Sequence, residues 1–222
     1  MMPLRTLLCT SWPRAIAACA AIALIALGGC SIQGTSGSLR TQSLGNDPVV
    51  FYGNFTSAYF SHSNAAGTSF MLTDSNLDDV ASGKVTNGQL LHVQLLWLPK
   101  AGSTPMEASA TNASIRYVVI SGGEVGVYSG AGFAMLGDSL DSKRVSLSLQ
   151  DATLQLQEST PGFRDVLSPA HMTGTFTARR DDNAARQLNH AASQLVTNAL
   201  GRTRIVYFDQ TEQGADPLAF RR

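Results

Sequence analysis

Residues 144–158 are Arg-Val-Ser-Leu-Ser-Leu-Gln-Asp-Ala-Thr-Leu-Gln-Leu-Gln-Glu, and apolar and polar side chains alternate along them. Alternation with a period of two is typical of a β-strand that buries one face. The apolar positions are odd in the first half and even in the second: Val145, Leu147, Leu149, Leu154 and Leu156. A turn centred on Asp151-Ala152 would bring both sets to one face, because facing residues of a hairpin share a face. We therefore predict a β-hairpin whose leucines point into the core.

The same period of two recurs along most of the chain, and it predicts a mainly β fold. The other expected strands cover residues 49–62, 68–73, 89–98, 114–120, 171–178 and 204–209. One helix is expected at 182–200, since Asp181 or Asp182 can cap its start and Gly201 its end. We expect an antiparallel β-sandwich, or a curled sheet, with this C-terminal amphipathic helix packed on it.

A different signal lies near the N-terminus. Arg5 and Arg14 precede residues 15–27, a run of small or aliphatic residues that is too short for a membrane span. The run closes on Leu27-Gly28-Gly29-Cys30. This arrangement is similar to the lipobox of bacterial lipoproteins. The resemblance implies that the leader is cleaved between the last two residues of the motif and that the cysteine carries fatty chains.

The resemblance also implies a location. A lipid anchor makes the membrane a partner, and two or three acyl chains hold a protein to a bilayer almost permanently. Ser31 follows the cysteine where an inner-membrane retention signal would have Asp, which implies the periplasmic face of the outer membrane. Cys9 and Cys19 would leave with the leader, and Cys30 would carry the lipid. The mature chain would then have no thiol for disulfides or metal binding.

These signals divide the chain into a signal peptide, a tether, one β-rich domain and a loose tail, at residues 1–29, 30–47, 48–209 and 210–222. Ser, Gly, Thr, Gln and Asn predominate in the tether, which is typical of a flexible segment. A first strand hidden in this polar sequence is the alternative. The whole chain has 16 basic and 16 acidic residues. Without a basic cluster we expect no nucleic acid partner.

The glycine-rich stretch 121–133 is the most unusual part of the expected domain. Glycine weakens a strand, so such density indicates turns, bulges or a close approach of backbone to another group. One hypothesis is a ligand rim formed by Glu124, Tyr128 and Ser129. The alternative, which we favour, is a hairpin turn at Gly122-Gly123 followed by a kinked strand.

Metal and catalytic motifs are missing from the sequence. Asp74, Asn76 and Asp78 have the spacing of the first ligands of a calcium loop, but Asp79 and Val85 stand where Gly and Glu are required. A capped helical turn is the better account. The four histidines have no metal-ligand spacing, and there is no nucleophile-elbow motif. We therefore expect no catalytic residue, no metal ligand and no cofactor.

These observations favour a lipid-anchored envelope protein that binds or scaffolds and does not catalyse a reaction. Its partner would be an envelope protein or a component of the cell wall. A small-molecule or lipid carrier is one alternative, and it needs an apolar cavity between sheets or under the helix. An envelope hydrolase is another, and it needs His92 or His171 within about 3 Å of a serine or carboxylate in a cleft. A compact, filled core with scattered histidines would rule out both alternatives.

Overall fold

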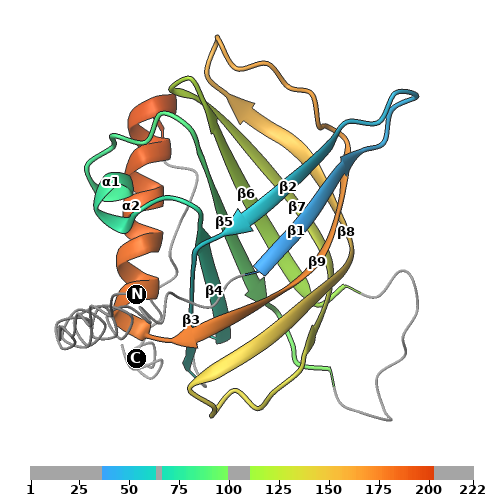
Figure 1. Ribbon diagram of the computed structural model, residues 1–222, viewed down its shortest axis with the longest axis vertical. Coiled ribbons are helices and arrows are strands. Elements are labelled where there is room, and N and C mark those ends of the chain that lie inside the picture. Colours follow the sequence, from blue (N-terminus) through green and yellow to red (C-terminus); the bar gives the residue numbers. More distant parts are fainter. Residues whose placement is uncertain (1–36, 64–66, 100–110, 203–222) are drawn as a thin grey trace, which may run out of the picture. The chain divides into compact units, whose positions relative to one another are not determined.

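Nine strands and two helices form the part of the chain that the structure, a computed structural model, describes: residues 37–63, 67–99 and 111–202 (Figure 1). The strands are β1 Gly37–Ser43, β2 Val50–Phe55, β3 Ser57–Ser63, β4 Gly67–Thr73, β5 Gly88–Leu95, β6 Ala113–Ser121, β7 Glu124–Leu136, β8 Arg144–Ser159 and β9 Ala170–Arg180. The helices are α1 Leu77–Ala81 and α2 Asp182–Leu200. The prediction of a mainly β fold with one C-terminal helix packed on it is confirmed.

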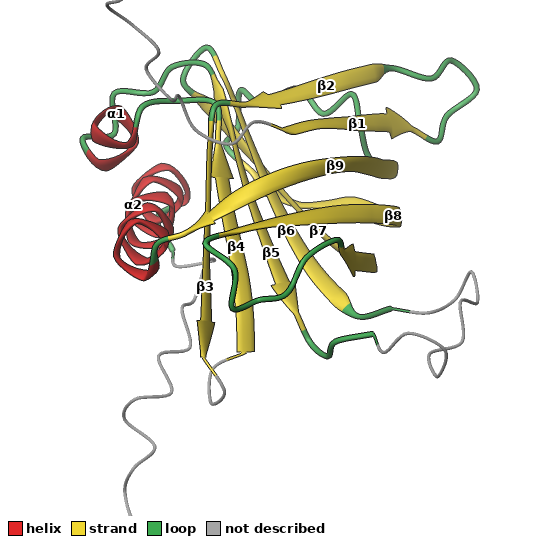
Figure 2. Ribbon diagram, turned by 60° about the horizontal axis from the view of Figure 1, so that its bottom comes forward, coloured by secondary structure: helices red, strands yellow, loops and turns green. Residues whose placement is uncertain are grey.

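The strands form a single sheet that curls until it closes on itself. Its order is β2-β1-β9-β3-β4-β5-β6-β7-β8, and β8 pairs in addition with β9. Neighbours are antiparallel except β3 and β9, which run parallel where Tyr59 faces Arg179. Strands β3 to β9 therefore make a closed ring, and β1 and β2 extend from β9 as a hairpin (Figure 2). Of the two expected architectures, the curled sheet is the one observed.

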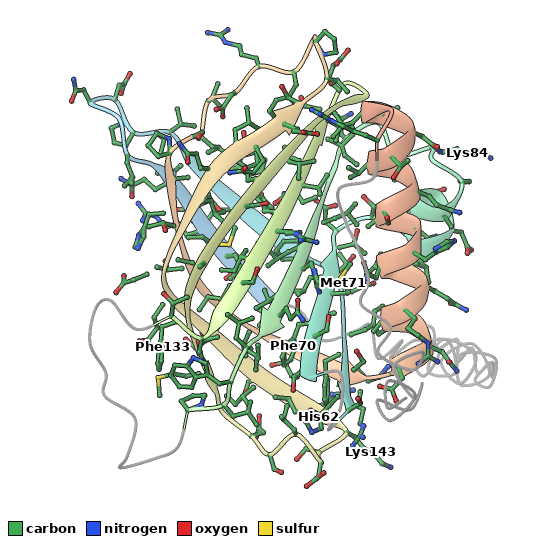
Figure 3. All side chains as sticks on the ribbon, turned by 180° about the vertical axis from the view of Figure 1, so that it is seen from behind. His62, Phe70, Met71, Lys84, Phe133 and Lys143 are labelled. Atoms are coloured by element: carbon green, nitrogen blue, oxygen red, sulfur yellow. The ribbon has the colours of Figure 1, made fainter. Side chains whose placement is uncertain are left out.

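Closure gives the sheet an inner and an outer face, and alternate residues of each strand point to opposite faces. Phe70 and Met71 of β4, both labelled in Figure 3, belong to the inner and the outer cluster of buried side chains respectively. The middle of the ring is filled by fully buried aromatic side chains. Among them, Phe70 stacks on Phe60 at 5.5 Å between ring centroids and meets Phe176 edge-on at 5.8 Å. The core of the domain is therefore the inside of the ring.

Helix α2 covers a second apolar patch, on the outer face. Leu188, Ala192 and Val196 of the helix are buried with Met71 and other outward-pointing residues of the sheet. The Asp181 carboxylate accepts a hydrogen bond from the N–H of Ala184, and the left-handed Gly201 closes the C-terminal end. These are the caps that the sequence predicts. Among the residues that the structure describes, no helix has the length and apolar character needed to span a membrane.

The predicted hairpin at 144–158 is wrong: the whole stretch is the single strand β8. A β-bulge replaces the turn, and the pairing with β9 shifts between Leu149 and Ala152. One extra residue in a strand reverses the parity of everything after it, so a bulge reconciles the odd and even leucines as well as a turn does. A hairpin turn of type I′ would also need a positive φ at Ala152, which alanine disfavours. Only Asp151 takes one, with φ of 49°.

The flexible tether predicted for 30–47 is also wrong where the structure describes it. Gly37–Ser43 is strand β1, paired with β2 on one side and with β9 on the other. Leu39 and Thr41 are buried, so the strand contributes to the core in spite of its polar composition. The hidden first strand, given above as the alternative, is what the structure contains. The lipobox at Cys30, the expected strand at 204–209 and the tail lie outside the described residues.

Candidate ligand-binding cavity

An open cavity lies at the end of the closed sheet where β5 begins, β6 ends and the connection from β8 to β9 passes, which is the upper end in Figure 1. Its volume is about 450 Å³, within the range of small-molecule sites. We call it the mouth cavity. It is lined by Phe51, Asp74, Asn87, Gly88, Gln89, Val119, Ile120, Ser121, Tyr128, Phe163, Arg164, Val166 and Leu167.

Aromatic side chains form one wall of the mouth cavity and the layer behind it. Tyr117 and Tyr128 face each other from neighbouring strands β6 and β7, with 6.1 Å between their ring centroids. Phe163, from the β8–β9 connection, meets Tyr128 edge-on at 6.3 Å. Its ring occupies the space beside Gly126, where a Cβ would lie only 2.3 Å from the ring atoms. The wall therefore offers flat apolar surface, held by edge-to-face contacts.

Hydrogen bonds fix the two tyrosine hydroxyls of this wall. Tyr117 donates to Oε1 of Gln89 over 2.6 Å, and Tyr128 donates to Oδ1 of Asp165 over 2.8 Å. Burial raises the pKa of both hydroxyls, and the hydrogen bond to Asp165 raises that of Tyr128 further. Both tyrosines therefore stay protonated at neutral pH, where they can donate hydrogen bonds but do not act as bases.

Asp74 also lines the mouth cavity. Asp74 follows β4 directly and is half-buried. Its Oδ1 accepts hydrogen bonds from the backbone N–H of Gln89 over 2.8 Å and from the Ser75 hydroxyl over 3.0 Å. These bonds hold the Asp74 side chain against the backbone at the start of β5. The negative charge of Asp74 adds to burial in raising the pKa of Tyr117.

The connection between β8 and β9 is a fixed wall of the cavity. The Glu124 carboxylate accepts hydrogen bonds from the Thr160 hydroxyl and from the N–H of Gly162, the latter over 3.2 Å. Asp165 accepts from the backbone N–H groups of Leu167 and Ser168 over 3.0 and 3.1 Å. Two carboxylates thus hold this connection across the end of the ring. The shape of the mouth cavity is therefore set before any ligand enters it.

The three residues predicted as a ligand rim take different places. Tyr128 lines the mouth cavity. Glu124 is not among the residues that line the cavity, and its carboxylate accepts hydrogen bonds from Thr160 and Gly162 of the β8–β9 connection. Ser129 belongs to the opposite parity of β7 and pairs with Arg116 of β6. The structure brings Tyr128 and Glu124 together at this end of the ring, and the role of the three residues toward a ligand stays a prediction.

The hairpin turn predicted at Gly122-Gly123 is confirmed. Gly122 and Gly123 form the two-residue turn between β6 and β7, with φ of 60° and 85°, as a hairpin of this type requires. Further along β7, Gly130 and Gly132 lie against the bulge of β8. A Cβ at Gly130 would lie 1.7 Å from the carbonyl oxygen of Thr153. Strand β7 is therefore rich in glycine because other parts of the chain lie against its backbone.

The two histidines considered for catalysis lie away from the mouth cavity. His92 is buried on the parity of β5 that points outward, and its Nε2 is hydrogen-bonded to Oγ of Ser69 at 2.8 Å. Burial, and to a smaller extent Arg116, lowers its pKa to about 4. His171 lies 3.2 Å from the carboxylate of Asp151 at the bulge. Both meet the distance named for a hydrolase, but neither residue lines the cavity.

The calcium-like stretch is a capped helical turn, as expected. Asn76 caps α1 by accepting a hydrogen bond from the N–H of Asp78. Within residues 37–63, 67–99 and 111–202, no group of three or more His, Cys, Asp or Glu side chains could hold a metal ion.

Most of the cavity was missed at the level of sequence. Gln89, Asp74 and Phe163 come from three segments that no local pattern connects. One sequence signal could have indicated two of these residues: Asp74 and Gln89 are polar residues at the ends of otherwise apolar strands. Comparison of the chain with protein-family models, with curated proteins and with solved structures found no match.

Proposed function

We propose that this chain is a lipid-anchored protein of the cell envelope that binds a small, largely apolar ligand in the mouth cavity and catalyses no reaction on it. The observation that carries the proposal is the cavity itself, about 450 Å³ in volume and walled by aromatic and aliphatic side chains. A concave apolar site with a few fixed polar groups is the common form of a small-molecule site. The cavity favours a small ligand over an envelope protein or a cell-wall polymer as the partner.

A carrier with a cavity between sheets or under the helix does not fit the fold, because the middle of the ring is filled and α2 packs closely on the sheet. The ligand therefore binds at the end of the ring, and part of it stays exposed. Such a site suits capture and presentation of a ligand at the membrane better than complete shielding during transport.

The anchor would hold the β domain close to the bilayer. Strand β1 begins at Gly37, so its start is seven residue-to-residue steps from Cys30. A fully extended chain spans at most about 3.5 Å per residue, which limits this separation to about 25 Å. With fatty chains on Cys30, the β domain would lie within one domain diameter of the membrane surface. A ligand that partitions into or out of the membrane would then be within reach.

Binding of N-phenyl-1-naphthylamine, a neutral aromatic dye that fluoresces in apolar sites, tests the proposal. The control pair is Val166→Trp against Val50→Trp, because both valines are exposed but only Val166 lines the mouth cavity. We expect saturable binding to the full chain in detergent, weakened about tenfold or more by Val166→Trp, a loss of about 1.4 kcal/mol. Val50→Trp should bind like the unaltered chain. Equal binding by both variants, or no saturable binding, would overturn the proposal.

A further inference from the structure

We propose that the mouth cavity selects ligands that carry a positively charged amine beside an apolar body. This inference rests on the proposed function, because it names the chemical class of the ligand for the same cavity. Three features of the cavity lead to it: the position of its charges, its aromatic wall and the fixed acceptor geometry of Asp74.

The charges at the cavity are unequal in burial. Asp74 is half-buried and bound to the backbone of β5, whereas Arg164, the cation at the cavity, is exposed on the β8–β9 connection. Water and salt screen an exposed charge strongly and a partly buried charge much less. Among the charged side chains that line the cavity, Asp74 is therefore the one that water and salt screen least.

The charge of Asp74 also acts on Tyr117, which lies behind the cavity wall. Its charge contributes to the raised pKa of Tyr117, whose hydroxyl donates to Gln89 behind the cavity wall. Gln89 itself is 8% exposed and lines the cavity. An ammonium group that enters the cavity therefore meets a half-buried carboxylate, which water screens less than an exposed one.

The aromatic wall acts in the same direction. Phe51, Tyr128 and Phe163 line the cavity, and the faces of aromatic rings attract cations through their quadrupole. An anion receives no such attraction and would be repelled by Asp74. A ligand with an apolar body gains from burial against Val119 and Leu167 as well. One cationic head on an apolar body thus matches both sets of groups.

Competition against the bound dye tests this inference with three ligands that share a phenylethyl group: 2-phenylethylamine, 2-phenylethanol and 3-phenylpropanoate, which are cationic, neutral and anionic at pH 7. We expect the amine to displace the dye at about a tenfold lower concentration than the alcohol, and the anion to be weakest. In Asp74→Asn the advantage of the amine over the alcohol should disappear. Asparagine keeps an Oδ1 that can accept from the N–H of Gln89 and the Ser75 hydroxyl, so the cavity should keep its shape, and amine and alcohol are compared within the same variant.

The matched control is Asp47→Asn, which removes an exposed carboxylate between β1 and β2 that does not line the cavity. This variant should keep the preference for the amine. Equal displacement by amine and alcohol in the unaltered chain, or a preference that survives in Asp74→Asn, would overturn the inference while leaving dye binding, and with it the proposed function, intact. Failure of the dye to bind would instead remove the proposed function.

Discussion

The buried His92 makes the stability of the fold depend on pH. Its pKa is lowered from 6.5 to about 4 in the folded chain, first by burial and then by the charge of Arg116. The unfolded chain therefore binds a proton more readily than the folded chain between about pH 6.5 and pH 4. A state that binds more protons gains as pH falls, so unfolding becomes easier on acidification through this window.

Replacement of His92 by asparagine should flatten that dependence. The neutral imidazole contributes fully above about pH 6.5, and up to about 3 kcal/mol of unfolding free energy is lost as pH falls to 4. Urea unfolding at a series of pH values measures this. His92→Asn should be less stable at pH 7 and show a smaller further loss toward pH 4. His190→Asn, at an exposed position of α2, should follow the unaltered chain. Parallel curves for all three proteins would show that His92 is not responsible.

At the scale of elements, the contact between β7 and β8 decides the local geometry around the bulge. Gly130 lies so close to the Thr153 carbonyl that any Cβ would overlap it. The pairing of β8 is irregular beside this contact, and glycine is the residue that leaves room for the close approach of the two strands. The glycines of β7 and the parity switch in β8 are therefore two signs of one structural feature.

Gly130→Ala should be among the most destabilising small substitutions in the domain. The added methyl group must push two paired strands apart, and overpacking of this kind costs about 1–3 kcal/mol. Gly45→Ala is the control, because a Cβ there meets nothing within 4 Å. It should change the unfolding free energy by less than about 0.5 kcal/mol. Chemical denaturation of both variants gives the two values. A loss as small for Gly130→Ala as for Gly45→Ala would mean that the strands separate freely.

Elements with a strong local pattern could be predicted from the sequence. Helix α2 has its caps and its apolar face in one continuous segment, and the turn at Gly122-Gly123 uses residues that suit its dihedral angles. Strand β1 could not be found in this way. Its buried positions include Thr41 and Ser43, which are buried because β2 and β9 flank the strand. Partners distant in sequence, and not intrinsic preference, make it a strand.

For the whole molecule, the closed ring could not be predicted because its closure depends on one strand with three neighbours. β9 pairs with β8 along one edge and with β1 and then β3 along the other. The mouth cavity exists only after that closure, since it combines the start of β5, the end of β6 and the β8–β9 connection. Of the residues that line the cavity, Tyr128 is the one that the sequence predicts as part of a ligand rim. The rest come together through long-range pairing.

Native mass spectrometry of the protein extracted from its own envelope tests the lipid anchor and the bound ligand together. We expect a denatured mass equal to the chain from Cys30 plus fatty acyl groups. We also expect a larger native mass, because a small bound molecule is released on denaturation, and Val166→Trp should lose this excess. Equal native and denatured masses for the unaltered protein would contradict ligand binding, and an unprocessed N-terminus would contradict the anchor.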